Sequence, residues 1–410
     1  MFGDFRRNPD GRPRRGFPFR VTGDLLARMM LSNSDMADLV ALRRELHRFP
    51  EVSGQEARTA RRITRELSGH PPDEIVTGLG GHGLAAVYNG AAEGPTVMFR
   101  CELDALPITE TGCSDYRSTN PGTAHLCGHD GHMAIIAGLA RCLARRRPAR
   151  GRAVLLFQPA EETGAGAATV IGDPGFPAIA PDYAFALHNL PGLALGRVGL
   201  VDGPVNCASC GLHLTLRGQE AHASAPETGL SPMRALGALM PALADLGHGT
   251  PEDADFALVT VTHARMGEPA FGIAPGEATL YATLRCLTDA GMAALVERAL
   301  TIAANLARAH GLRLDHEMSD AFLHCENDTD AVAILRGALD ALGLEHGTAG
   351  QPWRASEDFG RFGHSARAAM FVLGAGTDRP ALHTPEYDFP EDLIAPGVRI
   401  FERVARDLLG

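Results

Sequence analysis

Apolar positions in the first two hundred residues follow two spacings. Two segments have apolar residues at helical intervals and predict amphipathic helices: 38–47 and 132–147. The second carries an arginine-rich carboxyl end and is stopped by Pro148. Three continuous apolar runs predict buried strands: 96–100, 153–157 and 183–187. Strands that alternate with helices favour an α/β fold with a mostly parallel sheet.

The pattern changes near residue 208. Strands are expected at 212–216, 256–263, 278–287 and 313–318, and helices at 232–246 and 289–309. This βαββαβ order predicts a ferredoxin-like domain. It spans 209–317 and is inserted into a catalytic domain formed by 35–208 and 318–410. Residues 1–34 are expected to form a disordered amino-terminal arm, with a basic arm for an anionic partner or a translated leader as alternatives.

Composition narrows the function classes. The chain of 410 residues has a net charge of −11 and no lysine, so all 38 basic residues are arginine. Schiff-base chemistry, pyridoxal phosphate attachment and a Walker phosphate loop all need lysine and are disfavoured. An acidic chain of this kind is also a poor nucleic-acid binder. No secretory signal and no apolar run of membrane-spanning length is expected, so we predict a cytoplasmic protein.

The eight cysteines are scattered along the chain and do not resemble a disulfide framework. Cys207 and Cys210 form a lone CxxC without the second pair that a zinc ribbon requires. Their apolar surroundings favour a structural strand over a redox or metal role.

Residues 123–132 hold the densest set of candidate metal ligands. His125, Cys127, His129, Asp130 and His132 fall within eight positions. Thiolate and imidazole at this density indicate a transition-metal site. Gly128 between Cys127 and His129 permits a sharp turn that lets both side chains converge on one ion. The alternative is a polar loop in which Asp130 caps the following helix.

Three other segments offer further ligands. Glu161 and Glu162 follow a predicted strand at the end where α/β folds place ligands, and His188 follows another. Adjacent acids point in different directions, so one can bind metal while the other acts as a general base. His383 lies in a loop near the chain end and by itself would be an ordinary surface histidine.

Together these motifs resemble the co-catalytic metallohydrolase family of aminoacylases and carboxypeptidases. The nearest branch contains hippurate hydrolases, indole-acetyl-amino-acid hydrolases and bacterial N-acyl-amino-acid amidohydrolases. The resemblance runs from about residue 39 to 408. It rests on these segments: 43–47 with 50–51, 103–108, 125–132, 158–162, 188–189, 218–222, 357–359 and His383.

The resemblance implies a two-metal amidohydrolase acting on an N-acyl amino acid or related amide. Its metal ligands would be Cys127, His129, Glu162, His188 and His383, with the sulfur shared. Zinc suits these ligands best, and manganese, cobalt or nickel are alternatives. Glu161 would be the general base, and Asp104 would orient a ligand imidazole. His222 would polarise the scissile carbonyl, in one chain or across a homodimer formed by the inserted lid domain.

Two positions depart from the branch pattern. Glu102 replaces the usual Asp, and the longer acid is expected to reach toward the metals or distort their site. Gly272 replaces an Asn that helps to hold a substrate carboxylate, although Arg285 still matches the arginine on the next strand. We therefore hypothesise a substrate with an altered group on the amine side.

Two alternatives to the metal-dependent amidohydrolase are open. One is a cysteine hydrolase that uses Cys127 with His129. The other is a non-catalytic member of the same fold that binds a small molecule, an interpretation that the intact Glu161 disfavours. No nucleic-acid or membrane partner is expected.

Overall fold

The computed structural model describes residues 31–410. The predicted arm 1–34 therefore lies almost entirely outside the described residues. Helix α2 (Asn33–Arg48) begins two residues before the predicted domain boundary. Ser32 caps it by accepting a hydrogen bond from the Asp35 amide, and Asp35 accepts one from the Ser32 amide.

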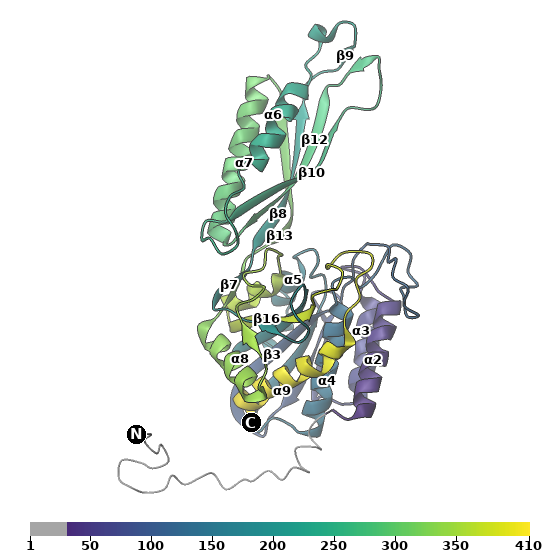
Figure 1. The fold of residues 1–410 in the computed structure, drawn as a ribbon, viewed down its shortest axis with the longest axis vertical. Coiled ribbons are helices and arrows are strands. Elements are labelled where there is room, and N and C mark those ends of the chain that lie inside the picture. Colours follow the sequence, from purple (N-terminus) through teal and green to yellow (C-terminus); the bar gives the residue numbers. More distant parts are fainter. Residues whose placement is uncertain (1–30) are drawn as a thin grey trace, which may run out of the picture.

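An eight-stranded sheet organises the larger unit, with strand order β1-β2-β4-β3-β5-β16-β6-β15 (Figure 1). Its strands are β1 (Glu74–Leu79), β2 (Gly83–Asn89), β3 (Ala92–Glu102), β4 (Arg150–Gln158), β5 (Tyr183–Pro191), β6 (Val198–Gly199), β15 (His346–Gly347) and β16 (Arg367–Gly376). The central strands β4, β3, β5 and β16 are parallel, whereas β1 and β2 pair antiparallel at one edge. The mostly parallel sheet predicted from the apolar runs is confirmed.

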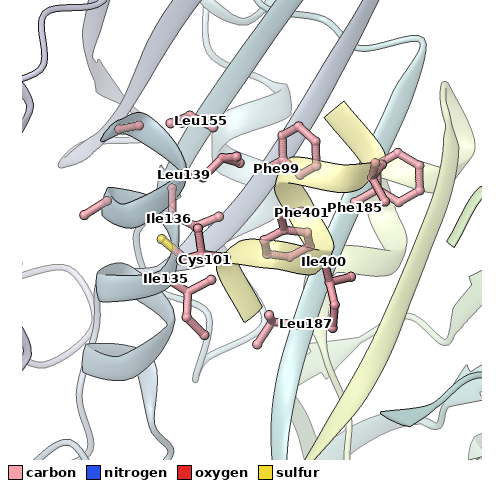
Figure 2. Packing of buried hydrophobic residues seen from close by; sticks show 14 of the residues in the cluster. Phe99, Cys101, Ile135, Ile136, Leu139, Leu155, Phe185, Leu187, Ile400 and Phe401 are labelled. Carbon is pink, nitrogen blue, oxygen red and sulfur yellow. The ribbon is translucent and has the colours of Figure 1, made fainter. Parts of the chain in front are cut away.

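Helices cover both faces of this sheet, as expected for an α/β unit. They are α2, α3 (Ala57–Ser68), α4 (His129–Arg145), α5 (Gly166–Ile171), α8 (Thr329–Leu342) and α9 (Ile394–Leu409). On one face Phe99 of β3 packs against Phe401 of α9 and Phe185 of β5, with ring centroids 5.2 and 6.0 Å apart (Figure 2). On the other face the neighbouring Met98 packs with α5 and the 3-10 helix Asp358–His364. Burial on both faces explains the continuous apolar runs.

The second unit is a four-stranded antiparallel sheet with two helices on one face. It contains β8 (Ala208–Arg217), α6 (Met233–Ala244), β10 (Ala257–Met266), β12 (Glu277–Cys286), α7 (Asp289–Ala309) and β13 (Arg313–Phe322). The strand order is β10-β12-β8-β13. Its own apolar core lies between the sheet and the helices. The strands extend five residues beyond the predicted boundary at 317.

Among the described helices, α7 is long and apolar enough to span a membrane by length and composition. The sequence analysis expected no such segment. Much of the apolar character of α7 comes from alanine, and its buried positions face the second sheet: Met292, Leu295, Ala299, Ala303 and Ala307. This packing gives its apolar stripe a partner within the second unit.

Two short pairs of strands mark the ends of the second unit. At the junction with the first unit, β7 (Gly203–Asn206) pairs with β14 (Cys325–Asn327). At the far end, β9 (Ala221–His222) pairs with β11 (Ile273–Ala274), and Figure 1 shows this tip remote from the larger sheet. The molecule is therefore elongated, with the second unit projecting from the first.

All eight cysteines lie in the described residues, and all are free thiols. Cys210 lies in β8, and Cys207 directly precedes that strand; both side chains are buried. The structural interpretation of this CxxC agrees with their positions.

Gly128 joins the two elements on which the candidate ligands depend. It precedes α4 with a φ of 99°, in the left-handed region. A Cβ atom at Gly128 would lie 1.8 Å from Oδ1 of Asn189, which follows His188 in β5. The Asn189 side-chain amide donates a hydrogen bond to the Cys127 carbonyl at 3.1 Å. Only glycine allows both the turn and this close approach.

We expect Gly128→Ala to lower the free energy of unfolding by at least about 2 kcal/mol, because it combines left-handed strain with a steric clash. Gly237→Ala is the matched control: Gly237 lies in α6 with no atom within 4 Å of an added Cβ. This control should stabilise the protein by up to about 1 kcal/mol. Urea unfolding followed by circular dichroism measures both, and equal midpoints would contradict the role given to Gly128.

Candidate metal centre

The four segments singled out in the sequence meet at one end of the larger sheet. Cys127 Sγ lies 3.3 Å from His188 Nε2 and 3.4 Å from His383 Nε2. Glu162 Oε2 lies 3.6 Å from His383 Nε2, and Glu162 Oε1 lies 3.9 Å from His129 Nε2. The donor atoms form two overlapping groups, Cys127–His129–His188 and Cys127–Glu162–His383, each within 4.8 Å. The sulfur belongs to both.

The donor atoms are oriented by contacts on their far sides. The Nδ1 atom of His129 donates to the Asp104 carbonyl at 2.9 Å, and Nδ1 of His188 donates to the Asn189 carbonyl at 2.8 Å. The Asp104 carboxylate also accepts a hydrogen bond from the Glu162 amide at 3.0 Å. These contacts direct Nε2 of both imidazoles toward Cys127. Such backing is characteristic of metal-binding histidines.

The cluster has the properties of a cation site. Two buried donor atoms, His129 Nε2 and Glu162 Oε1, have no hydrogen-bond partner among residues 31–410. Burial raises the pKa of Glu162 to about 7 and, together with Glu162 and Glu161, raises that of the Cys127 thiol well above its usual value. Buried acids that repel one another ionise together only when a cation lies between them. The donor set of one thiol, three imidazoles and one carboxylate therefore fits divalent transition metals.

Glu161 faces the same space as Glu162. Its Oε2 atom lies 3.9 Å from His129 Nε2. Burial, followed by the neighbouring Glu357 and Glu162, raises the pKa of Glu161 well above its usual value. A buried carboxyl group beside a cluster of ligand atoms has the placement of a general base.

Arg100 is the functional-site neighbour that sequence reasoning missed. It is fully buried and pairs with Glu102, with Glu357 at 2.8 Å and with Asp358 at 2.6 Å. The available signal was an arginine at the end of a continuous apolar run, where only a paired charge is tolerated. Without the positive charge of Arg100, the negative charges of these three carboxylates near Glu161 would not be neutralised.

Glu102 reaches toward the cluster, because its carboxylate forms a further group of potential ligands with His129 and His132 within 4.8 Å. Its carboxylate pairs with Arg100 on one side and with His132 Nδ1 at 2.6 Å on the other. His132 Nε2 in turn lies 3.1 Å from Oδ1 of Asn189. The longer acid is thus held by Arg100 and His132 in a layer that supports the ligand-bearing strand.

The remaining residues of the 123–132 motif have structural contacts. Asp130 Oδ2 forms an ion pair with Arg43 Nε at 2.8 Å and lies 2.8 Å from His47 Nδ1, so it ties α4 to α2. It does not cap α4, whose N-cap is Gly128. Burial lowers the pKa of His125 to about 3. Within residues 31–410, neither His125 nor Asp130 belongs to a group of potential ligands.

A cavity of about 360 Å³ adjoins the cluster. Its other lining residues come from both units: Ser209, Arg285, Phe322, Trp353, Ala355, Ser356 and Leu382. Arg285 Nη1 donates to Ser356 Oγ at 2.9 Å and to the Arg354 carbonyl at 3.1 Å. Across the described part of the chain, no carboxylate forms an ion pair with Arg285, and burial lowers its pKa.

His222 and Gly272 lie away from this cavity. Both belong to the tip of the second unit, where the Ala223 amide donates to the Gly272 carbonyl at 3.0 Å. The His222 side chain is exposed and contacts only its neighbour Ser224 among the hydrogen-bond partners in residues 31–410. Within one chain the structure therefore separates these two predicted substrate-binding residues from Arg285.

Comparison with known proteins agrees with this site. Residues 98–407 match the model of Peptidase family M20/M25/M40. An N-acetyl-L-cysteine deacetylase of Bacillus subtilis is 29% identical over 99% of this chain and 97% of its own length. An N-acetyldiaminopimelate deacetylase of Streptococcus sanguinis is 30% identical over 88% and 96%.

The fold has a counterpart among solved structures. A dinuclear metal-binding peptidase of the M20 family from Bacillus subtilis superposes with a TM-score of 0.78 at 26% identity, covering 92% of this chain and 99% of that one. The family match spans most of the sequence and includes Cys127, His129, both glutamates, His188 and His383. The chain belongs to Peptidase family M20/M25/M40.

Proposed function

We propose that this protein is a two-metal amidohydrolase that removes a small acyl group from an N-acyl amino acid. The observation that carries the proposal is the convergence of donor atoms on Cys127 Sγ beside the buried Glu161. Cys127, His129, Glu162, His188 and His383 would hold two divalent ions, with the sulfur shared between them. Zinc is the first candidate, and manganese, cobalt or nickel are the others. The deacetylase relatives support amide hydrolysis.

Different residues of the chain have different roles in the proposed hydrolysis. When bound, the two cations would polarise the amide carbonyl and acidify the attacking water. Glu161 accepts a proton from that water and delivers it to the nitrogen of the leaving amine. Asp104 holds His129 in the orientation that directs Nε2 toward the cluster. The Arg100 network balances the negative charge behind Glu161.

Two other functions fit the site less well. A cysteine hydrolase needs a thiol with a lowered pKa, whereas burial and two glutamates raise that of Cys127. A non-catalytic binding protein has no use for a buried general base beside the donor cluster, and the relatives named above are deacetylases.

We expect purified wild-type protein to contain up to about two divalent ions per chain and to hydrolyse N-acetyl amino acids in a chelator-sensitive reaction.

Glu161→Gln should keep the metal and lose at least about 100-fold in kcat, because general acid–base catalysis contributes about 10²–10⁴-fold. Cys127→Ser should lose metal and activity together. Elemental analysis and amine release measure these effects. Cys113→Ser, which alters an exposed thiol, is the control. An active Glu161→Gln enzyme would refute the assignment of the base.

Arg285 defines the proposed amine side of the substrate. The departure at Gly272 led to the hypothesis of an altered group on the amine side, but Arg285 lies in the cavity, and no carboxylate within residues 31–410 forms an ion pair with it. A guanidinium that is partly desolvated and unpaired is well suited to bind a carboxylate. We therefore propose that Arg285 binds the α-carboxylate of the substrate.

Accordingly, an N-acetyl amino acid should be hydrolysed at least about 10-fold faster, in kcat/KM, than its carboxamide, since a charged hydrogen bond is worth about 1.5–3 kcal/mol. Arg285→Gln should remove this preference. Arg354→Gln, which alters the exposed side chain of a residue whose backbone holds Arg285, is the control and should retain it. Equal rates for acid and carboxamide in the wild type would reject carboxylate binding by Arg285.

The second unit, proposed as a ferredoxin-like lid of about residues 209–317, also has a role in assembly. Arg285 lies near the base of β12, and His222 lies at the tip beyond its other end. The ten residues of β12 span roughly 30 Å at about 3.3 Å per residue. A hinge movement of a rigid sheet cannot bring both residues into one cavity. We propose that the lid forms a homodimer in which each tip supplies His222 to the other chain.

The exposed side chains around the tip support this arrangement. Phe271 is fully exposed, and Ile273, which pairs with His222 across the ribbon, is 53% exposed. Apolar side chains so far from either core favour a covered position in an assembly. The carbonyl-polarising role proposed for His222 requires that the covered position be the cavity of the partner.

Mixed dimers test this proposal. Glu161→Gln and His222→Ala are expected to be inactive alone, because each lacks one part of every site. Mixing the chains before refolding or during coexpression should restore about one quarter of wild-type activity, since random pairing gives one complete site in half of the dimers. Activity no greater than the sum of the separate variants, or a monomer by light scattering, would argue against a site completed by the partner.

A further inference from the structure

Trp353 is the only tryptophan of the chain and lies directly against the metal centre. Its ring centroid is 5.0 Å from that of His188, at an interplanar angle of 56°. The Trp353 amide donates a hydrogen bond to the Val205 carbonyl at 2.7 Å, and Trp353 forms a bridge with Asn206. The backbone of this segment is thus fixed on β7, and the position of the indole is set by the fold.

Three hollows meet at this indole. One is the catalytic cavity. A second, of about 400 Å³, lies beyond Trp353 and Leu382 and includes Leu190, Thr377 and Arg379 in its wall. A third, of about 670 Å³, lies between residues 249–252 of the second unit and 348–352 of the first. Trp353 is common to all three walls, whereas Leu382 is shared by the first and second and Leu190 by the second and third.

The scissile carbonyl carbon carries both the acyl group and the amine, so the two groups extend from the centre in different directions. Since the carboxylate of the amine is assigned to Arg285, we assign the acyl group to the wall formed by Trp353 and Leu382 next to the ligands. Trp353 packs on His188, and Leu382 precedes His383 in the chain. Arg285, which is proposed to bind the carboxylate, defines the amine side of the same cavity.

We infer that Trp353 is a specificity-determining residue that limits the acyl group to a size near acetyl by closing the catalytic cavity toward the two adjoining hollows. The inference rests on the proposed amide hydrolysis. A smaller side chain at this position would join the hollows and let a longer acyl chain extend past His188. Each methylene that becomes buried would then contribute about fourfold to kcat/KM.

The test compares N-acetyl-, N-butanoyl-, N-hexanoyl- and N-octanoylmethionine as substrates of the metal-loaded enzyme. In the wild type, kcat/KM should fall with acyl length. In Trp353→Ala the ratio of octanoyl to acetyl kcat/KM should rise at least about 100-fold, as several methylenes gain burial. Phe322→Ala is the matched control, because Phe322 lines the catalytic cavity and neither of the adjoining hollows. The ratio of octanoyl to acetyl kcat/KM in Phe322→Ala should stay near that of the wild type.

Other outcomes overturn the inference. If Trp353→Ala lowers kcat/KM by the same factor for every acyl length, the indole only supports His188. N-benzoylmethionine is measured as an additional substrate. If Trp353→Ala lowers kcat/KM for this substrate alone, the indole of Trp353 is a stacking surface for aromatic acyl groups. If the ratio of octanoyl to acetyl kcat/KM rises equally in Phe322→Ala, removal of any large side chain from the cavity wall has the same effect, and Trp353 has no special role.

A separate measurement distinguishes failure of the proposed function. If the metal-loaded wild type hydrolyses none of these amides, the function fails, and binding of the same series is measured by calorimetry. In the Glu161→Gln background, adding Trp353→Ala should then strengthen octanoyl over acetyl binding. If the ratio of octanoyl to acetyl affinity is the same with and without Trp353→Ala, Trp353 does not limit the size of the acyl group, and this conclusion does not depend on turnover. Tryptophan emission of Glu161→Gln alone should respond to ligand, because Trp353 is its only source.

Discussion

The convergence of Cys127, Glu162 and three imidazoles at one place is the constraint on which the rest of this structure depends. Burial and neighbouring acids oppose ionisation of the Cys127 thiol and the Glu162 carboxyl, and two of the donor atoms lack a hydrogen-bond partner within residues 31–410. Such an arrangement is unfavourable for the apoprotein and becomes favourable when cations enter. The stability of the site and its chemistry are therefore coupled through the same atoms.

The surrounding fold is organised to hold this arrangement. Asp104 and the Asn189 carbonyl orient two histidines, Gly128 allows the close approach of α4 and β5, and Arg100 neutralises the acids behind Glu161. Apart from the contact between the adjacent His188 and Asn189, these contacts join segments that are distant in sequence. Parallel strands bring them together, because their carboxyl ends meet at one edge of the sheet.

The two units contribute different parts of the cavity. The larger unit supplies the proposed ligands and the proposed base, whereas the second supplies Arg285 from the end of β12. The length of that strand keeps the tip remote from its own cavity. The extent of β12 is thus the physical reason why His222 and Gly272 lie away from Arg285 within one chain. Trp353 adds a further boundary, placed between the cavity and unoccupied volume around it.

The sequence by itself determined the parts of this protein whose signals are local. Apolar periodicity predicted the parallel strands and the βαββαβ order of elements, and ligand chemistry with motif order indicated the residues around Cys127. Tertiary structure decided what depends on direction and distance. Neighbouring candidates with similar chemistry diverged, since His129 faces the cluster while Asp130 pairs with Arg43 and His132 with Glu102. The roles of Arg100 and Trp353, and the separation of His222 from Arg285, could not be read locally because each follows from packing between distant segments.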